Sequence, residues 1–320
     1  MCARVLLHPP RRCMIALVGE QPLPNLLPIR HYRPQAAVLI YTARTRVVFE
    51  RLSQTLGQGA LTIRGVEVDP YDVIAIEQAI CAAIQELEEH ELLFNLTGGT
   101  KAMALAAYRV AEQRQAEVLY LESERGQSLA YRYNWSNGAL HVGQKETLPA
   151  YLTLSDMLNV HLGPGMWQEH GASRQEGGPF EEAIATALQP HVDEMMIGVK
   201  TQDAQIDIDL VVRLGNQFGA IEAKTGKSAG TLEGLKQLIT NSSPLGRYTA
   251  RFYVINTEPN QLHKEIMDAF NIQVIALRSC NRDTHSLSDQ DRERLVEDVL
   301  RRLRAAESPA QDGTPVASRK

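Results

Sequence analysis

The feature that most constrains the fold of this chain is a regular alternation of short apolar runs with amphipathic segments. Apolar runs of strand type occupy residues 13–18, 37–41, 61–68, 92–96 and 118–121. Amphipathic segments of helical type occupy residues 47–56, 71–87 and 102–112. Strands that are joined through helices run parallel within one sheet and carry those helices on its faces. We therefore predict an α/β fold for this half of the chain.

The carboxyl ends of these strands carry the residues that we expect to bind a ligand. In Rossmann-like parallel sheets, ligands bind in a crevice at that edge. Residues 92–96 run into a Thr-Gly-Gly-Thr-Lys turn, residues 97–101, which opens the next helix. Such a turn presents backbone N–H donors and a favourable helix dipole to a phosphate or a nucleotide edge. Two adjacent glycines after a strand also form plain tight turns, so the motif alone leaves both interpretations open.

The candidate ligand-binding residues come from three segments at this edge. Met103, one turn into the helix, is either an apolar contact for a base or part of the core. The full set is Gly19, Gln21, Pro22, Asn25, Thr42, Thr97, Gly98, Gly99, Thr100, Lys101 and Met103.

A second constellation of polar residues lies in the other half of the chain. Asp207 and Asp209 are two residues apart in one predicted strand, and Glu222 and Lys224 are two apart in the next. Side chains two apart in a strand share a face, so both pairs face one cleft. Carboxylates beside an ammonium group could hold a divalent metal and position an attacking water, which predicts a phosphodiester-cutting enzyme. The opposite face is predicted to be core, formed by Ile206, Ile208, Leu210, Val212, Ile221 and Ala223.

An acid and a lysine on one strand face are more often solvated surface, so the surrounding elements must decide. An amphipathic helix opens at Gly178-Pro179-Phe180-Glu181-Glu182, before the two strands. After them come a helix, a strand, a helix and a strand, at residues 232–239, 250–256, 261–270 and 272–277. This order resembles the core of the PD-(D/E)xK nucleases, a restriction-endonuclease-like α/β fold.

The resemblance assigns roles residue by residue. Glu181 stands at the first-helix acid, Asp209 at the strand aspartate, and Glu222 and Lys224 at the paired acid and lysine. It implies Mg²⁺ or Mn²⁺ held by Asp209, Glu222, a carbonyl near Ala223 and Glu181. Lys224 would position or help deprotonate the attacking water. Asp207 is one methylene shorter than the glutamate of many relatives, which favours a role in tuning the metal.

The first half resembles another family when its segments are taken together. These segments are Gly19-Glu20-Gln21-Pro22-Leu23-Pro24-Asn25-Leu26-Leu27-Pro28, Tyr41-Thr42 and Asn95-Leu96-Thr97-Gly98-Gly99-Thr100-Lys101-Ala102-Met103. They look like those of a CARF domain, the CRISPR-associated Rossmann-fold sensor of cyclic oligoadenylates. A CARF domain followed by a PD-(D/E)xK nuclease is the layout of the Card/Can ancillary effectors of type III CRISPR antiviral defence.

This layout implies an allosterically activated enzyme. The resemblance covers roughly residues 10–280. It implies a homodimer that binds cyclic tetra-adenylate, or the hexa-adenylate, and thereby activates nuclease domains against DNA, RNA or both. A ring with repeated symmetry suits the two-fold axis of a homodimer.

Three functions remain open from the sequence alone. The first is a second-messenger-activated nuclease, which the joint presence of Glu181, Asp209, Glu222 and Lys224 favours. The second is a CARF sensor with a non-catalytic scaffold domain. The third is a ring nuclease that degrades the cyclic oligoadenylate, for which Lys101 and Thr42 are the candidate residues.

Length and composition fit a two-domain protein without a membrane segment. The 320 residues, 44% of them apolar, are enough for two cores. The net charge of −5 argues against constitutive, purely electrostatic binding of nucleic acid. Four cysteines without pairing or zinc-type spacing, and the lack of long apolar runs, predict reduced thiols and a cytoplasmic protein. We expect a sensor domain at residues 1–147, a connector at 148–177, a nuclease domain at 178–307 and a disordered tail at 308–320.

Overall fold

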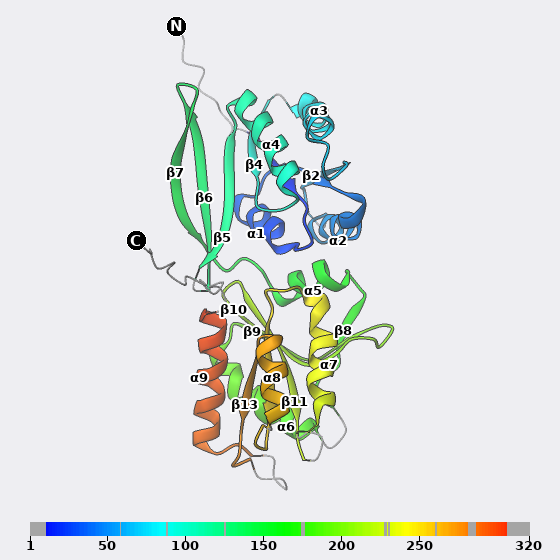
Figure 1. Cartoon of the computed structure of the whole chain (residues 1–320), viewed down its shortest axis with the longest axis vertical. Helices are drawn as coiled ribbons and strands as arrows, with labels where there is room; N and C mark the ends of the chain where they lie inside the picture. The colour runs from blue at the N-terminus through cyan, green and yellow to red at the C-terminus, as the bar shows by residue number, and fades with distance from the viewer. Residues whose placement is uncertain are drawn as a thin grey trace, which may run out of the picture.

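The structure, a computed structural model, describes residues 11–305 except residues 58, 88, 125, 174–176, 227, 228, 230, 260 and 281–285. Two β-sheets lie one above the other along the long axis of the molecule (Figure 1). We call residues 11–148, which hold the upper sheet, the N-terminal half, and residues 167–305, which hold the lower sheet, the C-terminal half. Cys2 and the predicted tail at residues 308–320 lie outside the described residues.

The N-terminal half contains a seven-stranded sheet in the order β3-β2-β1-β4-β5-β6-β7. The first five strands in this order run parallel, and β6 and β7 add an antiparallel hairpin at one edge. The predicted parallel α/β sheet is therefore confirmed. The strands are β1 (Arg11–Leu17), β2 (Ala36–Tyr41), β3 (Thr62–Glu67), β4 (His90–Asn95), β5 (Glu117–Glu124), β6 (Gln127–Ser136) and β7 (Ala139–Leu148). The helices are α1 (Leu23–Tyr32), α2 (Arg46–Leu56), α3 (Val73–Ile84) and α4 (Lys101–Arg114), with short 3₁₀ turns η1 (Ala43–Thr45) and η2 (Gln85–Leu87).

Helices cover both faces of this sheet because its central strands are apolar on both faces. In β1, Met14 and Ala16 pack on the side of α1 and α2. The intervening Ile15 and Leu17 pack on the side of α3 and α4. Alternate residues of one strand thus supply two separate cores. Because the first five strands run parallel, their carboxyl ends lie at one shared edge of the sheet.

The C-terminal half contains a six-stranded sheet in the order β13-β12-β11-β10-β9-β8. Strands β8 to β11 are antiparallel, whereas β11, β12 and β13 run parallel. The strands are β8 (Trp167–Glu169), β9 (Glu194–Thr201), β10 (Asp207–Leu214), β11 (Gln217–Lys224), β12 (Ala250–Ile255) and β13 (Ile272–Ala276). The helices are α6 (Gly178–Leu188), α7 (Leu232–Ser242), α8 (Gln261–Ala269) and α9 (Asp289–Ala305), with 3₁₀ turns η3 (Gln189–His191) and η5 (Ser243–Leu245).

The two faces of this sheet pack against different helices. Leu210, Val212 and Ile221 lie in a core with α6 and α9, as predicted for the face opposite the acids. Ile206 and Ile208 are exceptions, because both pack against the core on the α7 side, Ile208 together with its cross-strand partner Val199. The neighbouring residue of β9, Gly198, has a φ of 67°, which lies outside the range of a regular strand.

One apolar core joins the two halves through helix α5 (Leu154–Leu162), which lies between the sheets (Figure 1). Met157 and Leu158 of α5 are fully buried. They belong to the same cluster as Leu52 of α2 above and Leu245 of η5 below. Part of the predicted connector is therefore a core element shared by both halves.

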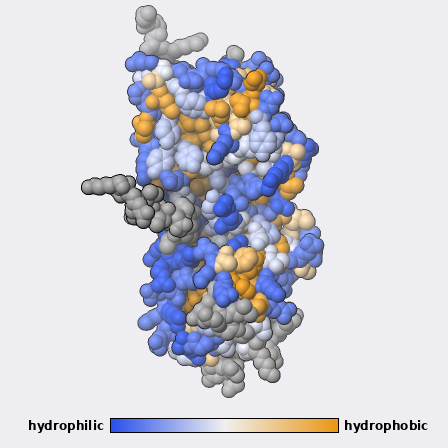
Figure 2. All heavy atoms as spheres, viewed as in Figure 1, coloured by the Kyte–Doolittle hydropathy of each residue, from blue (hydrophilic) through white to orange (hydrophobic). Residues whose placement is uncertain are grey.

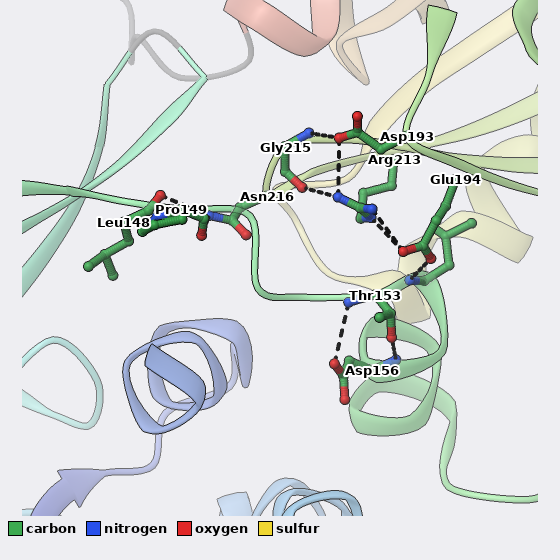
Figure 3. Close-up of polar contacts among 10 residues, drawn as sticks. Leu148, Pro149, Thr153, Asp156, Asp193, Glu194, Arg213, Gly215 and Asn216 are labelled. Carbon is green, nitrogen blue, oxygen red and sulfur yellow. Dashed lines mark hydrogen bonds and ion pairs between the residues drawn. The ribbon is translucent and has the colours of Figure 1, made fainter. Parts of the chain in front are cut away.

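Polar contacts hold the connector from both sides. The backbone N–H of Leu154 donates a hydrogen bond to Glu194 at 2.7 Å, and Arg213 donates to the other oxygen of the same carboxylate at 2.8 Å (Figure 3). Asn216 donates to the carbonyl of Pro149 at 3.0 Å (Figure 3). On the opposite side, Arg30 of α1 forms an ion pair with Asp156, also at 2.8 Å. These contacts fix α5 to β9 and β10 as well as to α1.

A buried histidine at this junction makes the stability of the protein sensitive to pH. His161 is 6% exposed, and burial lowers its pKa from 6.5 to about 4, a shift that the carbonyl of Pro244 opposes and the charge of Arg51 increases. Between these pH values the unfolded chain binds a proton that the folded chain excludes. The stabilisation is therefore complete above pH 6.5 and is lost as the pH falls toward 4, by about 3 kcal/mol.

The variant His161→Gln, which cannot ionise, isolates this contribution from that of the carboxyl groups. Urea unfolding at pH 7 and at pH 4 should show a smaller loss of unfolding free energy in the variant than in the wild type, by about 3 kcal/mol. Equal losses in the two proteins would show that His161 does not set this pH dependence.

Candidate functional site

Asn95, a fully buried residue at the end of β4, joins the predicted ligand-binding segments at the carboxyl edge of the upper sheet, the place of the predicted crevice, which we call the upper crevice. Its Nδ2 donates hydrogen bonds to the carbonyl of Pro24 at 2.9 Å and to Oδ1 of Asn25 at 3.2 Å. Its Oδ1 accepts a hydrogen bond from the hydroxyl of Thr97 at 2.7 Å. Asn25 in turn donates to the carbonyl of Leu17 at 2.9 Å. Asn25 and Thr97, two of the predicted ligand residues, are thus engaged within the protein.

The segment after β1 forms a helix that the sequence analysis did not predict. Helix α1 begins at Leu23, and prolines are tolerated in a first helical turn. Pro28 lies inside the helix and lacks the N–H that would bond to the carbonyl of Pro24, four residues earlier. The side chain of Asn95 donates to that carbonyl instead. A residue on β4 therefore compensates for a proline in α1.

Glycines allow the turn after β1 and the turn after β4 to lie against each other. A Cβ atom at Gly98 would lie 2.0 Å from the carbonyl oxygen of Leu17. A Cβ atom at Gly19 would lie 3.1 Å from the backbone nitrogen of Gly99, whose φ of 72° favours glycine. The predicted strand, glycine turn and helix N-terminus are all present, and α4 begins at Lys101.

Burial divides the other predicted ligand residues into two groups. Pro22, Thr42 and Met103 are buried, and the Met103 sulfur packs beneath Gly99, which assigns Met103 to the core. The hydroxyl of Thr100 caps α4, accepting from the backbone N–H of Met103 at 3.2 Å. The predicted residues that remain at least partly exposed at the crevice edge are Gly19, Gln21, Thr97, Gly98, Gly99, Thr100 and Lys101.

The acid and lysine side chains of β10 and β11 meet on the sheet face that α7 covers. Lys224 forms an ion pair with Glu222, and its Nζ lies 3.8 Å from Oδ2 of Asp209. That oxygen of Asp209 also accepts a hydrogen bond from the backbone N–H of Ala223 at 2.7 Å. Asp207 forms an ion pair with Lys200 at 2.8 Å, and its charge contributes to the raised pKa of both Asp209 and Glu222. The structure thus brings three of the four predicted catalytic residues together.

Burial controls the electrostatics of this cluster. Glu222 is fully buried and Asp209 is 9% exposed, and burial raises the pKa of both carboxyl groups. The charge of Asp209 raises the pKa of Glu222 further, whereas Lys224 opposes both shifts. Burial alone would lower the pKa of Lys224, but the two carboxylates hold it above its ordinary value. When both acids are ionised, two carboxylates and one ammonium group leave one surplus negative charge, which a cation would offset.

Glu181, the fourth predicted catalytic residue, lies on α6 and is buried. Its Oε2 accepts a hydrogen bond from the backbone N–H of Ser173 at 2.9 Å. Its charge adds to the raised pKa of Asp209, although it contributes less than burial does. Glu181 therefore influences the cluster electrostatically and is held by the loop that precedes α6.

Two carboxylates of this site fit a hard divalent cation. Within the part of the chain that the structure describes, no group of three or more His, Cys, Asp or Glu residues is arranged to hold a metal. Glu222 nevertheless has both carboxylate oxygens buried, and apart from the ion pair with Lys224 neither has a hydrogen-bond partner in that part. Asp209 and Glu222 thus provide two carboxylate side chains that could serve as oxygen ligands.

Tyr253 and Gly234 also belong to this site, and the sequence analysis missed both. Tyr253 on β12 is the register partner of Glu222 and is fully buried. Burial raises the pKa of its hydroxyl, and the charges of Glu222 and Asp209 raise it further. A Cβ atom at Gly234 of α7 would lie 2.5 Å from the Tyr253 hydroxyl oxygen and 3.0 Å from Cγ of Lys224. Helix α7 therefore approaches the lysine without any intervening space.

The N-terminal half, with its Asn95-braced crevice, can be compared with known families. Residues 13–155 match the Card1 CARF domain. The match runs from β1 into α5 and includes every predicted ligand residue. It supports the CARF-type fold predicted for this half. No curated protein sequence matches the chain.

Solved structures share the fold of both halves at low sequence identity. Can2 from Sulfobacillus thermosulfidooxidans, in complex with cyclic tetra-adenylate, has a TM-score of 0.71 at 16% identity over 92% of this chain and 98% of that chain. Protein VC1899 from Vibrio cholerae has a TM-score of 0.68 at 13% identity over 93% of this chain and 99% of that chain. A type III CRISPR defence DNA nuclease activated by cyclic oligoadenylate has a TM-score of 0.65 at 15% identity over 91% of this chain and 52% of that chain.

None of the helices in the described residues is long and apolar enough to span a membrane.

Proposed function

We propose that this chain is a cytoplasmic, metal-dependent nuclease of type III CRISPR antiviral defence that is activated by cyclic tetra-adenylate. The N-terminal half is the CARF sensor, and the C-terminal half is a PD-(D/E)xK nuclease core that cleaves DNA, RNA or both. The domain limits are those expected from the sequence, with a sensor at residues 1–147, a connector at 148–177 and a nuclease at 178–307.

One observation carries this proposal. Asp209, Glu222 and Lys224 meet in a buried cluster on a sheet that shares a continuous apolar core with the CARF-like half. A structural ion pair requires no second carboxylate beside it, and two buried carboxylates that share one lysine are costly for the fold. Functional sites are where such costs are commonly found. The cluster therefore supports catalysis better than it supports a scaffold.

The roles of the residues follow from this geometry. A bound Mg²⁺ or Mn²⁺ would supply a Lewis acid for the scissile phosphate and would lower the pKa of the attacking water. Asp209 and Glu222 would hold the ion, together with the carbonyl of Ala223 and with Glu181. The N–H of Ala223 orients Asp209 through the hydrogen bond described above. Lys224, whose ammonium group lies beside both carboxylates, would bind the phosphate or the attacking water.

We propose that the active form is a homodimer joined through α3 and α4. Tyr71, Ile74 and Leu105 are 77%, 68% and 54% exposed, and all lie on or next to these two helices. Figure 2 shows apolar side chains gathered over this region of a largely hydrophilic face. Thr100 ties this region to the crevice, because its hydroxyl donates to the carbonyl of Pro70. A second copy placed here would cover the apolar surface and bring two crevices together.

Charged substitutions should separate the dimer. Ile74→Asp with Leu105→Asp should change the mass in solution from about twice the chain mass of 35.6 kDa to one chain mass, because a buried unpaired carboxylate opposes association. Light scattering coupled to size exclusion measures this directly. The control is Val142→Asp on β7, which is 80% exposed and lies on the hairpin. Equal masses for the wild type and the double variant would contradict the proposed interface.

A cleavage panel tests the proposed function. Purified protein is incubated with supercoiled DNA, single-stranded DNA or single-stranded RNA, in Mg²⁺, Mn²⁺ or EDTA, with cyclic tetra-adenylate, cyclic hexa-adenylate or no ring. We expect metal-dependent cleavage that requires one of the rings. Ring binding without any cleavage would favour a sensor with a scaffold domain, and consumption of the ring would favour a ring nuclease. Thr42, a candidate residue for the ring-nuclease function, is buried, and its hydroxyl lies 3.3 Å from that of Thr45.

A further inference from the structure

Three segments that are distant in sequence meet beneath the upper crevice. Gly246, in the turn after η5, has a φ of 88° and has no space for a side chain. A Cβ atom there would lie 2.5 Å from the side-chain oxygen of Gln21 and 2.7 Å from Cε1 of His161. Gln21 belongs to the turn between β1 and α1, and His161 belongs to α5. The turn of the C-terminal half therefore packs directly against the sensor turn.

Helix α7 connects this contact to the acid–lysine cluster. Its 11 residues span about 16 Å, and η5 and Gly246 continue from its last residue, Ser242. Near its first turn, Gly234 lies against Tyr253 and Lys224, as described above. One end of the helix thus approaches the sensor turn through Gly246, and the other approaches Lys224.

Contacts along α7 hold it as a unit on the sheet. Asn241 donates a hydrogen bond to the carbonyl of Asp207 at the start of β10. The buried hydroxyl of Ser242 accepts a hydrogen bond from Arg251 of β12 at 2.8 Å. Leu235 and Leu238 are buried in the core that also contains Tyr253. Closely packed elements transmit a displacement, because no void is available to absorb it.

We propose that α7 is the element through which the sensor turn positions Lys224, with Gly246 as the point of contact. This inference rests on the proposed function, since it assigns the regulation of the same site. A ring bound at the crevice edge would shift the turn that carries Gln21. Because Gly246 lies against the side-chain oxygen of Gln21 and the buried ring of His161, the shift is passed to η5 and α7. Because Gly234 leaves none beside Lys224, the lysine moves relative to Glu222 and Asp209.

The path through Gly246 and α7 is separate from the stretch of chain that connects the two halves. The chain passes from β7 to α5 through residues 149–153, and α5 is clamped to Glu194 and Arg30. Those contacts fix α5 between the two sheets, and Figure 3 shows the one with Glu194. The contact at Gly246 instead joins the turn that carries Gln21 to helix α7, which lies beside the acid–lysine cluster. It is therefore the more direct path for a signal from ligand to lysine.

Two glycine variants distinguish the effect of the contact at Gly246 from the effect of backbone strain at a positive φ. Gly246→Ala places a methyl group against Gln21 and His161 at a positive φ. Gly138→Ala, at the tip of the β6–β7 hairpin, has a similar φ of 75° and open space around the new methyl group. Gly246→Ala should still be saturated by cyclic tetra-adenylate and should keep the basal cleavage rate measured without the ring. The ratio of cleavage rates with and without the ring should fall about tenfold or more. Gly138→Ala should retain the wild-type ratio.

Hydrogen exchange gives a second readout that does not depend on cleavage. Cyclic tetra-adenylate should change the exchange of residues 232–246 in the wild type and in Gly138→Ala, but not in Gly246→Ala. Normal activation of Gly246→Ala, or unchanged exchange of residues 232–246 in ring-bound wild type, would overturn the inference. A wild type that never cleaves, yet shows the exchange response, would overturn the proposed nuclease function and leave the coupling intact. A wild type that does not bind the ring would overturn both.

Discussion

Replacement of Glu222 by glutamine should reduce ring-dependent cleavage by at least about a thousandfold while the fold stays intact. The substitution keeps the shape of the side chain and removes its charge. Glu222 is the fully buried acid of the cluster, so the loss of its charge leaves Asp209 as the remaining carboxylate beside Lys224. Single-turnover cleavage at saturating metal and ring measures the effect.

The stability of this variant distinguishes lost chemistry from unfolding. Burial raises the pKa of Glu222, which means that the folded protein disfavours the ionised form. A neutral glutamine should therefore leave the metal-free melting temperature at least as high as that of the wild type. The control is Glu265→Gln on α8, an exposed position that should retain full activity. More than a tenth of wild-type cleavage in Glu222→Gln would remove this residue from the catalytic group.

Gly98→Ala should weaken the binding of cyclic tetra-adenylate about a hundredfold or more, equivalent to about 2.7 kcal/mol. The new methyl group would lie 2.0 Å from the carbonyl oxygen of Leu17, so the whole turn must move away from β1. The backbone groups of this turn and the start of α4 are the proposed site for the phosphates of the ring. Isothermal titration calorimetry with cyclic tetra-adenylate measures the loss.

A matched glycine provides the control for this experiment. Gly59 precedes β3, and a Cβ atom there meets nothing within 4 Å. Gly59→Ala should therefore bind the ring as the wild type does. If Gly98→Ala and Gly59→Ala share the wild-type Kd, the glycine turn is only a tight connection between β4 and α4.

The parts of the fold that could be predicted from the sequence are those with local periodicity. Alternating strands and helices predicted the parallel sheet of the N-terminal half, because two-residue and 3.6-residue periods are properties of single segments. The same reasoning placed Glu222 and Lys224 on one strand face, where the structure has them. Helix α1 was missed, since its prolines resemble those of a turn and its residues are buried on most sides. Helix α9 was missed although Leu295, Val299 and Leu303 form an apolar stripe.

The parts that could not be predicted depend on contacts between distant residues. Asn95 bonds to residues about 70 positions earlier, and only the folded chain shows that it replaces a missing helical hydrogen bond in α1. Tyr253 joins the acid cluster because β12 pairs with β11, a register that no local pattern specifies. The contact of Gly246 with Gln21 spans the two halves of the molecule. Such contacts determine which of the predicted polar residues line a site and which support it.

Activation requires that the ring bind the active state of the protein more tightly than the inactive state. To raise the active fraction from about 1% to about 99%, it must bind the active state about 10⁴-fold more tightly, a difference of roughly 5.5 kcal/mol. Charge-assisted contacts from Lys101 and from the start of α4, repeated in both subunits of a dimer, could provide such a difference.

The most direct measurement is a titration of cleavage rate against cyclic tetra-adenylate, run beside calorimetric binding of the same ring under the same metal conditions. In this account the sensor is coupled to the acid–lysine cluster. The cleavage rate should therefore rise from near zero to a plateau over the concentrations at which the ring binds. Glu222→Gln should bind the ring with the same Kd and show no rise. Saturation of the binding site with no change in the cleavage of any substrate would contradict the account.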